Sequence, residues 1–103
     1  MRLCSISPEA IQDLDQISTY FAGRNVEAGD RLLNVFDAKC RKLMLFPMMG
    51  RSYADLKPGL RGVPLEGYII LYQVTEETLT VLRVVSGRQN LTDVFADDPL
   101  DDR

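Results

Sequence analysis

The fold depends on Tyr68-Ile-Ile-Leu-Tyr-Gln-Val-Thr75 and Thr78-Leu-Thr-Val-Leu-Arg-Val-Val-Ser86, two runs that only Glu76-Glu77 separates. Both runs are rich in β-branched and aromatic residues, so together they predict a β-hairpin. Strand side chains alternate between two faces. By that alternation the second run carries Leu79, Val81, Arg83 and Val85 on one face and Thr80, Leu82, Val84 and Ser86 on the other. Both faces are mostly apolar, which places the hairpin in the middle of a covered sheet.

Upstream of the hairpin the sequence predicts a short strand and two helices. Residues 2–6 alternate weakly, as a first strand would. Ser7-Pro8-Glu9 is typical of a helix start, because serine caps the helix and proline tolerates its first position. Apolar residues then recur at helical spacing, and we expect them to be buried: Ala10, Ile11, Leu14, Ile17 and Phe21. Gly23 ends this helix, and Asn25 begins a second that stops at Pro47, giving an antiparallel helical hairpin.

Downstream of the helices, Leu60–Leu65 predicts a further strand. Gly62 and Pro64 within it are typical of a strand at a sheet edge or of a bulge. Asn90 is expected to cap a last helical turn. The predicted fold class is therefore α+β, with an N-terminal strand and a helical hairpin packed on a twisted antiparallel β-sheet. We expect residues 1–96 to form a single domain and residues 97–103 to be an acidic, mobile tail.

Composition excludes several classes of protein. No apolar run reaches the roughly 18 residues of a membrane span, and the first residues do not resemble a signal peptide, so we expect a cytoplasmic protein without a membrane partner. Cys4 and Cys40 are the only cysteines and the chain has no histidine. Neither a disulfide framework nor a metal site is expected, and no cofactor motif is present. We expect both cysteines to be buried or half-buried thiols.

Charge is distributed unevenly along the chain. The net charge of −3 equals that of the last seven residues, so residues 1–96 are neutral. Between Lys39 and Arg88, however, eight basic residues stand against four acidic ones. Such a segment can be a solvated surface, or it can approach nucleic acid or an acidic partner.

A series of short motifs runs through the chain in the order Ser7-Pro8-Glu9-Ala10, Phe46-Pro47, Gly50-Arg51, Pro58-Gly59-Leu60-Arg61, Tyr68-x-x-x-Tyr72-x-Val74, Val81-Leu82-Arg83-Val84, Gly87-Arg88 and Leu91. Their order and spacing over nearly residues 4–95 resemble the ParE-like branch of the RelE/ParE toxin superfamily. The resemblance implies a strand, a helical hairpin and an antiparallel sheet, in a toxin that an antitoxin encoded beside it neutralises.

The resemblance implies one of two activities, since members either cleave mRNA on the ribosome or, in the ParE-like branch, act on DNA gyrase. Cleavage needs a base, an acid and cations around the phosphate. Aligned on Gly87, the arginine of the cleaving members falls near Gln89 and their terminal tyrosine near Phe95, and neither residue can do that work. We therefore expect no enzymatic activity. Many ParE-like members also carry a histidine before the glycine, where this chain has Ser86, and an arginine where Gln89 stands, and these departures leave a weak or inactive toxin as an alternative.

The sequence thus predicts the toxin of a type II toxin-antitoxin system, which inhibits DNA gyrase by binding. Its partners are a cognate antitoxin and gyrase, with operator DNA reached only through the antitoxin. Three alternatives stay open: a ribosome-dependent mRNA-cleaving toxin, an inactive relative that only binds the antitoxin, and a nucleic-acid-binding module that uses the basic segment.

Two groups of residues are candidates for these contacts. The gyrase-binding candidates are the arginines Arg83, Arg88, Arg61 and Arg51. Alternatively, Arg83 does not bind gyrase, and its guanidinium pairs with a carboxylate such as Glu66 or an acid of the antitoxin. The apolar arc of the second helix and the edge-like strand give the antitoxin-binding candidates Leu33, Met44, Phe36 and Leu60. Tyr68 and Tyr72 are expected to pack in the sheet rather than to stack on bases.

Overall fold

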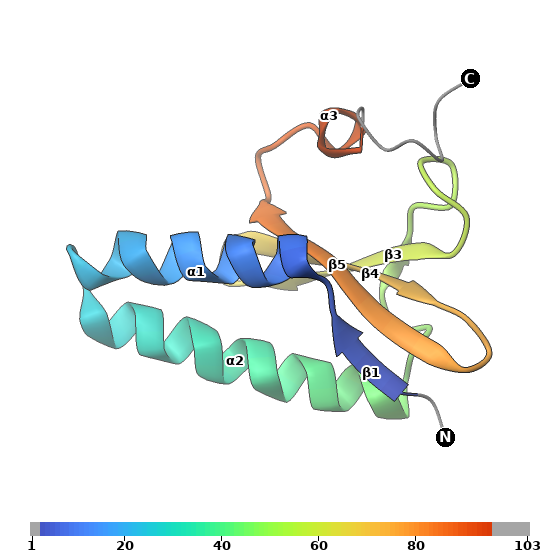
Figure 1. Cartoon of the computed structure of the whole chain (residues 1–103), viewed down its shortest axis with the longest axis horizontal. Coiled ribbons are helices and arrows are strands. Elements are labelled where there is room, and N and C mark those ends of the chain that lie inside the picture. The colour runs from blue at the N-terminus through green and yellow to red at the C-terminus, as the bar shows by residue number, and fades with distance from the viewer. Residues whose placement is uncertain (1–2, 96–103) are drawn as a thin grey trace.

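The computed structural model describes residues 3–95, so the predicted acidic tail lies outside the described part of the chain. One strand, two helices, four strands and a last helix follow in order (Figure 1). Their bounds are β1 Leu3–Ile6, α1 Pro8–Ala22, α2 Val26–Leu45, β2 Arg51–Ser52, β3 Leu60–Leu65, β4 Tyr68–Val74, β5 Thr78–Ser86 and α3 Leu91–Val94. Within these residues no helix is both long and apolar enough to cross a membrane.

The helix ends lie where the sequence predicts them. The Ser7 hydroxyl accepts the amide hydrogen of Ala10 (3.0 Å), and the Asn25 side chain accepts that of Ala28 (3.1 Å). Gly23 caps the end of α1, and α2 stops two residues before Pro47. Each polar cap satisfies an amide that has no partner within the helix, so short-range chemistry alone fixes these boundaries.

The sheet is mixed, with strand order β1-β5-β4-β3-β2. Strands β2 to β5 pair antiparallel, as predicted, and β1 pairs parallel to β5, with Leu3 opposite Thr78 and Ile6 opposite Val81. The predicted α+β fold is confirmed, and the structure adds the direction of the N-terminal strand, which the sequence did not predict. Four weakly alternating residues do not encode strand direction; the direction is set by the path of the chain into α1.

Strands β3 and β4 form a second hairpin that the sequence reasoning did not identify. Its two turn residues, Glu66 and Gly67, both have positive φ (47° and 89°), as a tight hairpin turn requires. At the outer side of β3, β2 pairs only with Arg61 and Gly62. The predicted edge character of β3 thus holds for Val63 to Leu65, which have no outer strand neighbour within residues 3–95.

A bulge in β5 changes which side chains share a face. Leu71 of β4 lies opposite Arg83, whereas the next residue, Tyr72, lies opposite Val81, so Leu82 is the extra residue. The predicted alternation therefore fails beyond Leu82. Val84 joins Leu79 and Val81 in the main core, and Val85 joins Leu82 on the opposite face.

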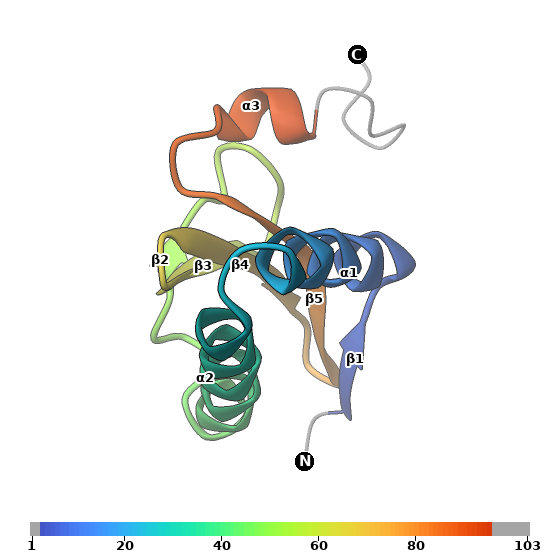
Figure 2. The same ribbon diagram turned by 90° about the vertical axis from the view of Figure 1, so that its left-hand side faces the viewer.

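The two faces of the sheet carry separate hydrophobic cores. The main core lies between the sheet and the hairpin of α1 and α2, and a smaller one lies under α3 on the other face (Figure 2). In α1, Ile17 is buried and Leu14 and Phe21 are partly buried, as predicted. Ile11, however, is 56% exposed, and the polar Asp13 is buried instead. The prediction for Ile11 is wrong because α1 is rotated to bring Asp13 to β5.

The two thiols differ in their surroundings. Cys40 is buried, as expected, and burial raises its pKa to about 12. Cys4, on the edge strand β1, is exposed, contrary to expectation. An edge strand with a single neighbour leaves its side chains less covered than a central strand does.

Tyr72 anchors the loop that connects α2 to β2. Its side chain is fully buried in the main core, where the hydroxyl donates to the carbonyl of Pro47 (2.8 Å) and accepts the amide hydrogen of Gly50 (3.0 Å). Burial raises the pKa of this phenol. A side chain at Gly50 would collide with the same hydroxyl, so this position requires glycine.

We predict that Tyr72→Phe lowers the free energy of unfolding by about 1–3 kcal/mol, because it leaves a buried carbonyl and a buried amide without their partner. Tyr20→Phe is the matched control, since Tyr20 is half-exposed and its hydroxyl has no hydrogen-bond partner within residues 3–95. Urea unfolding monitored by circular dichroism measures both variants. Equal stabilities for the two variants would show that the Tyr72 hydroxyl does not hold the loop.

Candidate functional site

Arg83 is bound by Asp13 of α1 rather than free for a partner. Its Nε donates to Asp13 Oδ2 (2.7 Å) and its Nη2 to Asp13 Oδ1 (3.0 Å), while the amide of Val84 also donates to Oδ2 (2.9 Å). The hydrogen bond to Asp13 raises the pKa of Arg83. We call this arrangement the Asp13 clasp. The prediction that Arg83 pairs with Glu66 is wrong, since Glu66 pairs with Arg31 of α2.

A polar groove of about 390 Å³ lies beside the Asp13 clasp, between α1 and the ends of β4 and β5. Besides the clasp, its polar lining is Gln16, Tyr20, Tyr68, Ser86 and Gln89. Hydroxyl and amide groups of this kind donate and accept hydrogen bonds. The groove is therefore suited to holding a polar group of a partner.

Arg88 lies just beyond the end of β5 and is exposed. Its amide donates to the Ser86 hydroxyl (3.2 Å), and the amide of Gln89 donates to the Ser86 carbonyl (3.0 Å), so the turn is held locally. The guanidinium of Arg88 has no hydrogen-bond or ion-pair partner within residues 3–95. Arg88 thus presents an unpaired cation from an ordered turn.

The other two predicted arginines lie elsewhere on the sheet. Arg61 is half-buried, and its Nη1 donates to the carbonyls of Gly50 (2.7 Å) and Met48 (3.3 Å), so it holds the loop after α2. Arg51 is exposed, with its guanidinium 5.2 Å from the centre of the Tyr53 ring. Arg51 and Arg83 are separated by β3 and β4, about 14 Å at the spacing of paired strands. The four arginines therefore do not form one cluster.

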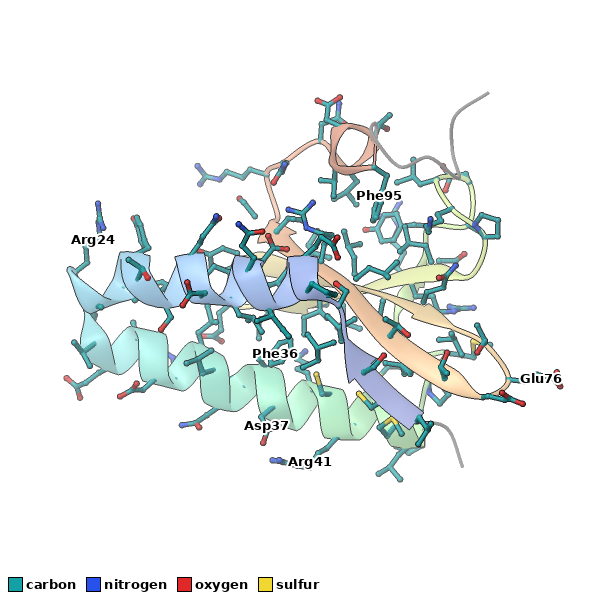
Figure 3. The ribbon with its side chains drawn as sticks, in the orientation of Figure 1. Arg24, Phe36, Asp37, Arg41, Glu76 and Phe95 are labelled. Atoms are coloured by element: carbon teal, nitrogen blue, oxygen red, sulfur yellow. The ribbon has the colours of Figure 1, made fainter. Side chains whose placement is uncertain are left out.

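The face of the sheet beneath α3 is filled with apolar side chains. Leu60, Leu71 and Val85 are buried there, and Phe95 packs against them from the end of α3 (Figure 3). Gln89 is exposed in the preceding turn. Within residues 3–95 no group of three or more His, Cys, Asp or Glu side chains is arranged to hold a metal ion. This face thus carries a second apolar core, in which Tyr53 is partly buried.

The chain matches the family model described as the ParE toxin of type II toxin-antitoxin system, parDE, over residues 5–91. It belongs to this family. A relative is Toxin ParE3 of Caulobacter vibrioides, which is 34% identical over 80 residues, or 77% of this chain and 80% of that protein. The fold is also similar to a solved chain of a chromosomal ParDE TA system from P. aeruginosa, with a TM-score of 0.70 at 19% identity, covering 84% of this chain and 96% of that one.

In this ParE-family toxin the four antitoxin-binding candidates differ in accessibility. Phe36 and Leu60 are 7% and 0% exposed, so they belong to the two cores, and the expectation that they form a surface is wrong. Figure 3 shows Phe36 pointing toward the sheet, while Asp37 and Arg41 point away from it. Met44 is partly buried against the main core, and Leu33, at 36%, is the most accessible of the four. A helix packed on a sheet buries the residues in the middle of its apolar arc first.

Sequence reasoning missed a more exposed apolar surface of the toxin. Leu45 and Phe46 are 74% and 58% exposed, and Met48 and Met49 are 60% and 39% exposed. We call these four residues the 45–49 surface. The signal was present as four large apolar residues around Pro47. Because proline ends the helix, the residues after it cannot continue the buried helical stripe.

We predict that Asp13→Ala lowers the free energy of unfolding by about 3–5 kcal/mol, because it leaves the partly buried Arg83 without its counter-charge. Asp15→Ala, on the exposed side of the same helix, is the matched control for the change in helix propensity. Thermal and urea unfolding of both variants give the difference. Losses of equal size would mean that the Asp13 clasp contributes nothing beyond an exposed carboxylate.

Proposed function

We propose that this ParE-family toxin inhibits DNA gyrase by binding it in the cytoplasm, and that a cognate antitoxin encoded beside it neutralises this activity. One observation carries the proposal for mechanism. The positions where the cleaving members of the superfamily are expected to have an arginine and a tyrosine hold Gln89 and Phe95, and Phe95 contributes to an apolar core.

Cleavage of RNA by its own 2′-oxygen would require a group to remove one proton, a group to supply another, and cations near the phosphate. On the face beneath α3, the cluster that contains Phe95 is mostly aliphatic, with Leu60, Leu71, Val85 and Leu91 among its members, and it also includes Tyr53. The aliphatic side chains can neither transfer protons nor stabilise a phosphorane. The composition of this face supports a toxin that acts through binding.

Arg88 is the residue best placed to contact the target. It is exposed and unpaired within residues 3–95, and it lies at the end of β5 next to Ser86 and Gln89, which line the polar groove. Arg83 contributes indirectly, since the Asp13 clasp fixes the end of β5 from which Arg88 projects. A cation on an ordered turn can pair with a carboxylate of a protein partner at little entropic cost.

The antitoxin is proposed from the amount of apolar side chain that the toxin leaves uncovered. Leu33, Leu45, Phe46 and Met48 each expose a third or more of their surface, and the last three lie around Pro47. Clustered apolar exposure of this kind marks a surface that a partner covers. Operator DNA is proposed to be bound only through the antitoxin.

We predict that Arg88→Ala weakens inhibition of purified gyrase by about 30-fold, equivalent to the roughly 2 kcal/mol typical of a buried interface arginine. Its melting temperature should match that of the wild type, because Arg88 makes no side-chain contact that the fold needs. Arg24→Ala is the matched control, since Arg24 is exposed at the far end of α1, where it stacks on Tyr20. A supercoiling assay measures all three proteins.

The same preparations should be tested on ribosome-bound mRNA. Codon-dependent cleavage with unaffected supercoiling would assign the toxin to the cleaving branch instead. If the toxin neither inhibits gyrase nor cleaves mRNA while the antitoxin still binds, the chain is an inactive, antitoxin-binding relative. Loss of gyrase inhibition in Arg24→Ala but not in Arg88→Ala would move the target-binding surface to the other end of α1.

A further inference from the structure

The 45–49 surface is held rigidly although its side chains face outward. The carbonyl of Pro47 accepts the Tyr72 hydroxyl, and those of Met48 and Gly50 accept Arg61 Nη1. The amide of Phe46 donates to the carbonyl of Lys42 (2.9 Å), and that of Met49 to the carbonyl of Phe46 (3.1 Å). Most backbone groups of this loop thus have partners within the toxin, and covering those groups by apolar side chains carries little desolvation cost.

Charge around the 45–49 surface is mostly basic. Residues 37–55 contain four basic residues, Lys39, Arg41, Lys42 and Arg51, and two acidic ones, Asp37 and Asp55. Arg41 pairs with Asp37 one turn earlier, and both side chains are exposed. The apolar residues are thus bordered by cations, on the helix before them and on β2 after them. A covering partner would have to place carboxylates around its own apolar residues.

A groove along α2 leads to this surface. It has a volume of about 570 Å³. Glu27, Asp30 and Arg31 line it near the start of α2, and Val35, Ala38 and Lys42 line it toward the 45–49 surface. Leu45 lies three residues after Lys42 and seven after Ala38, so it continues the same helical face. An elongated segment lying in the groove would therefore reach the 45–49 surface at its end.

We propose that the 45–49 surface is the docking site of an acidic amphipathic segment of the antitoxin, with apolar side chains against Phe46 and Met48 and carboxylates against Lys39 and Lys42. This inference rests on the proposed antitoxin partner and identifies the part of the toxin that it covers. A second copy of the chain is disfavoured as the occupant, since it would bring the same cations face to face. Methionine suits the role because its flexible side chain adapts to the shape of the apolar groups it contacts.

The test uses the small protein encoded by the adjacent reading frame, titrated calorimetrically into the full-length toxin. Phe46→Glu and Met48→Glu should each weaken binding by about 30-fold or more, as expected for an interface anchor. Val26→Glu is the matched control, since Val26 is 61% exposed at the opposite end of α2, and its affinity should equal that of the wild type. All three variants should melt at the wild-type temperature because the replaced side chains are exposed.

A separate charge-reversal experiment tests whether the segment is acidic. The double variant Lys39→Glu/Lys42→Glu should bind about 10-fold or more weakly at low salt and lose most of that difference at high salt. Arg24→Glu, distant from the surface, should bind as the wild type does. If the charge reversal has no effect, the partner is not an acidic segment and the proposal is overturned.

The remaining outcomes separate the two proposals. No binding to the wild-type toxin would overturn both the antitoxin partnership and the inference that rests on it. Equal binding by wild type and Phe46→Glu would overturn the inference alone. Flotation with phosphatidylglycerol vesicles that Phe46→Glu abolishes, together with unchanged antitoxin affinity, would assign the 45–49 surface to an anionic membrane and overturn the proposal as well.

Discussion

The carboxylate of Asp13 lies where β5 loses its neighbour β1, and much of the structure depends on the groups that this carboxylate binds. Strand β1 accompanies β5 only as far as Val81. Beyond that point, within residues 3–95, α1 supplies the partners. The amide and hydroxyl of Ser7 donate to the carbonyls of Val81 and Leu82 (both 2.9 Å), and Asp13 accepts from Val84 and Arg83. The start of α1 thereby completes the edge of β5 in place of a strand.

This arrangement decides which arginines can act. A charged pair with little access to solvent is costly to break, since either partner alone would remain poorly solvated. Arg83 is therefore fixed as part of the scaffold, and Arg61 is fixed likewise on the carbonyls of Gly50 and Met48. Of the four arginine candidates, Arg88 at the end of β5 and Arg51 on β2 remain exposed, as does the 45–49 surface at the end of α2. The clasp holds the end of β5 in place, and Tyr72 holds the loop after α2.

Local chemistry made much of the fold predictable. The caps at Ser7 and Asn25, the stop before Pro47 and the hairpin around Glu76-Glu77 each depend on residues within a few positions of one another. The family resemblance was confirmed over residues 5–91, and its motifs lie partly at these caps and turns and partly within β4 and β5. The bulge at Leu82 was not predictable, because nothing in an apolar strand marks an extra residue.

Two missed features led to wrong expectations. Without the bulge, Val85 was assigned to the face of Leu79 and Val81, and Val84 to the face of Leu82. Without the Asp13 clasp, Ile11 was expected in the core, since its spacing fits the apolar stripe as well as that of Ile17 does. The candidate site was less predictable than the fold, because accessibility depends on packing between distant segments: Phe36 and Leu60 match a binding surface in hydrophobicity but are covered.

The most direct measurement of the central claim is the native-state hydrogen exchange of the Val84 amide, compared between wild type and Asp13→Ala by NMR. If Asp13 completes the edge of β5, this amide should be protected in the wild type as strongly as amides within the β4–β5 ladder. In the variant it should then lose more protection than those ladder amides do. Exchange of Val84 at the rate of an exposed amide in the wild type, or an unchanged ratio in the variant, would contradict the claim.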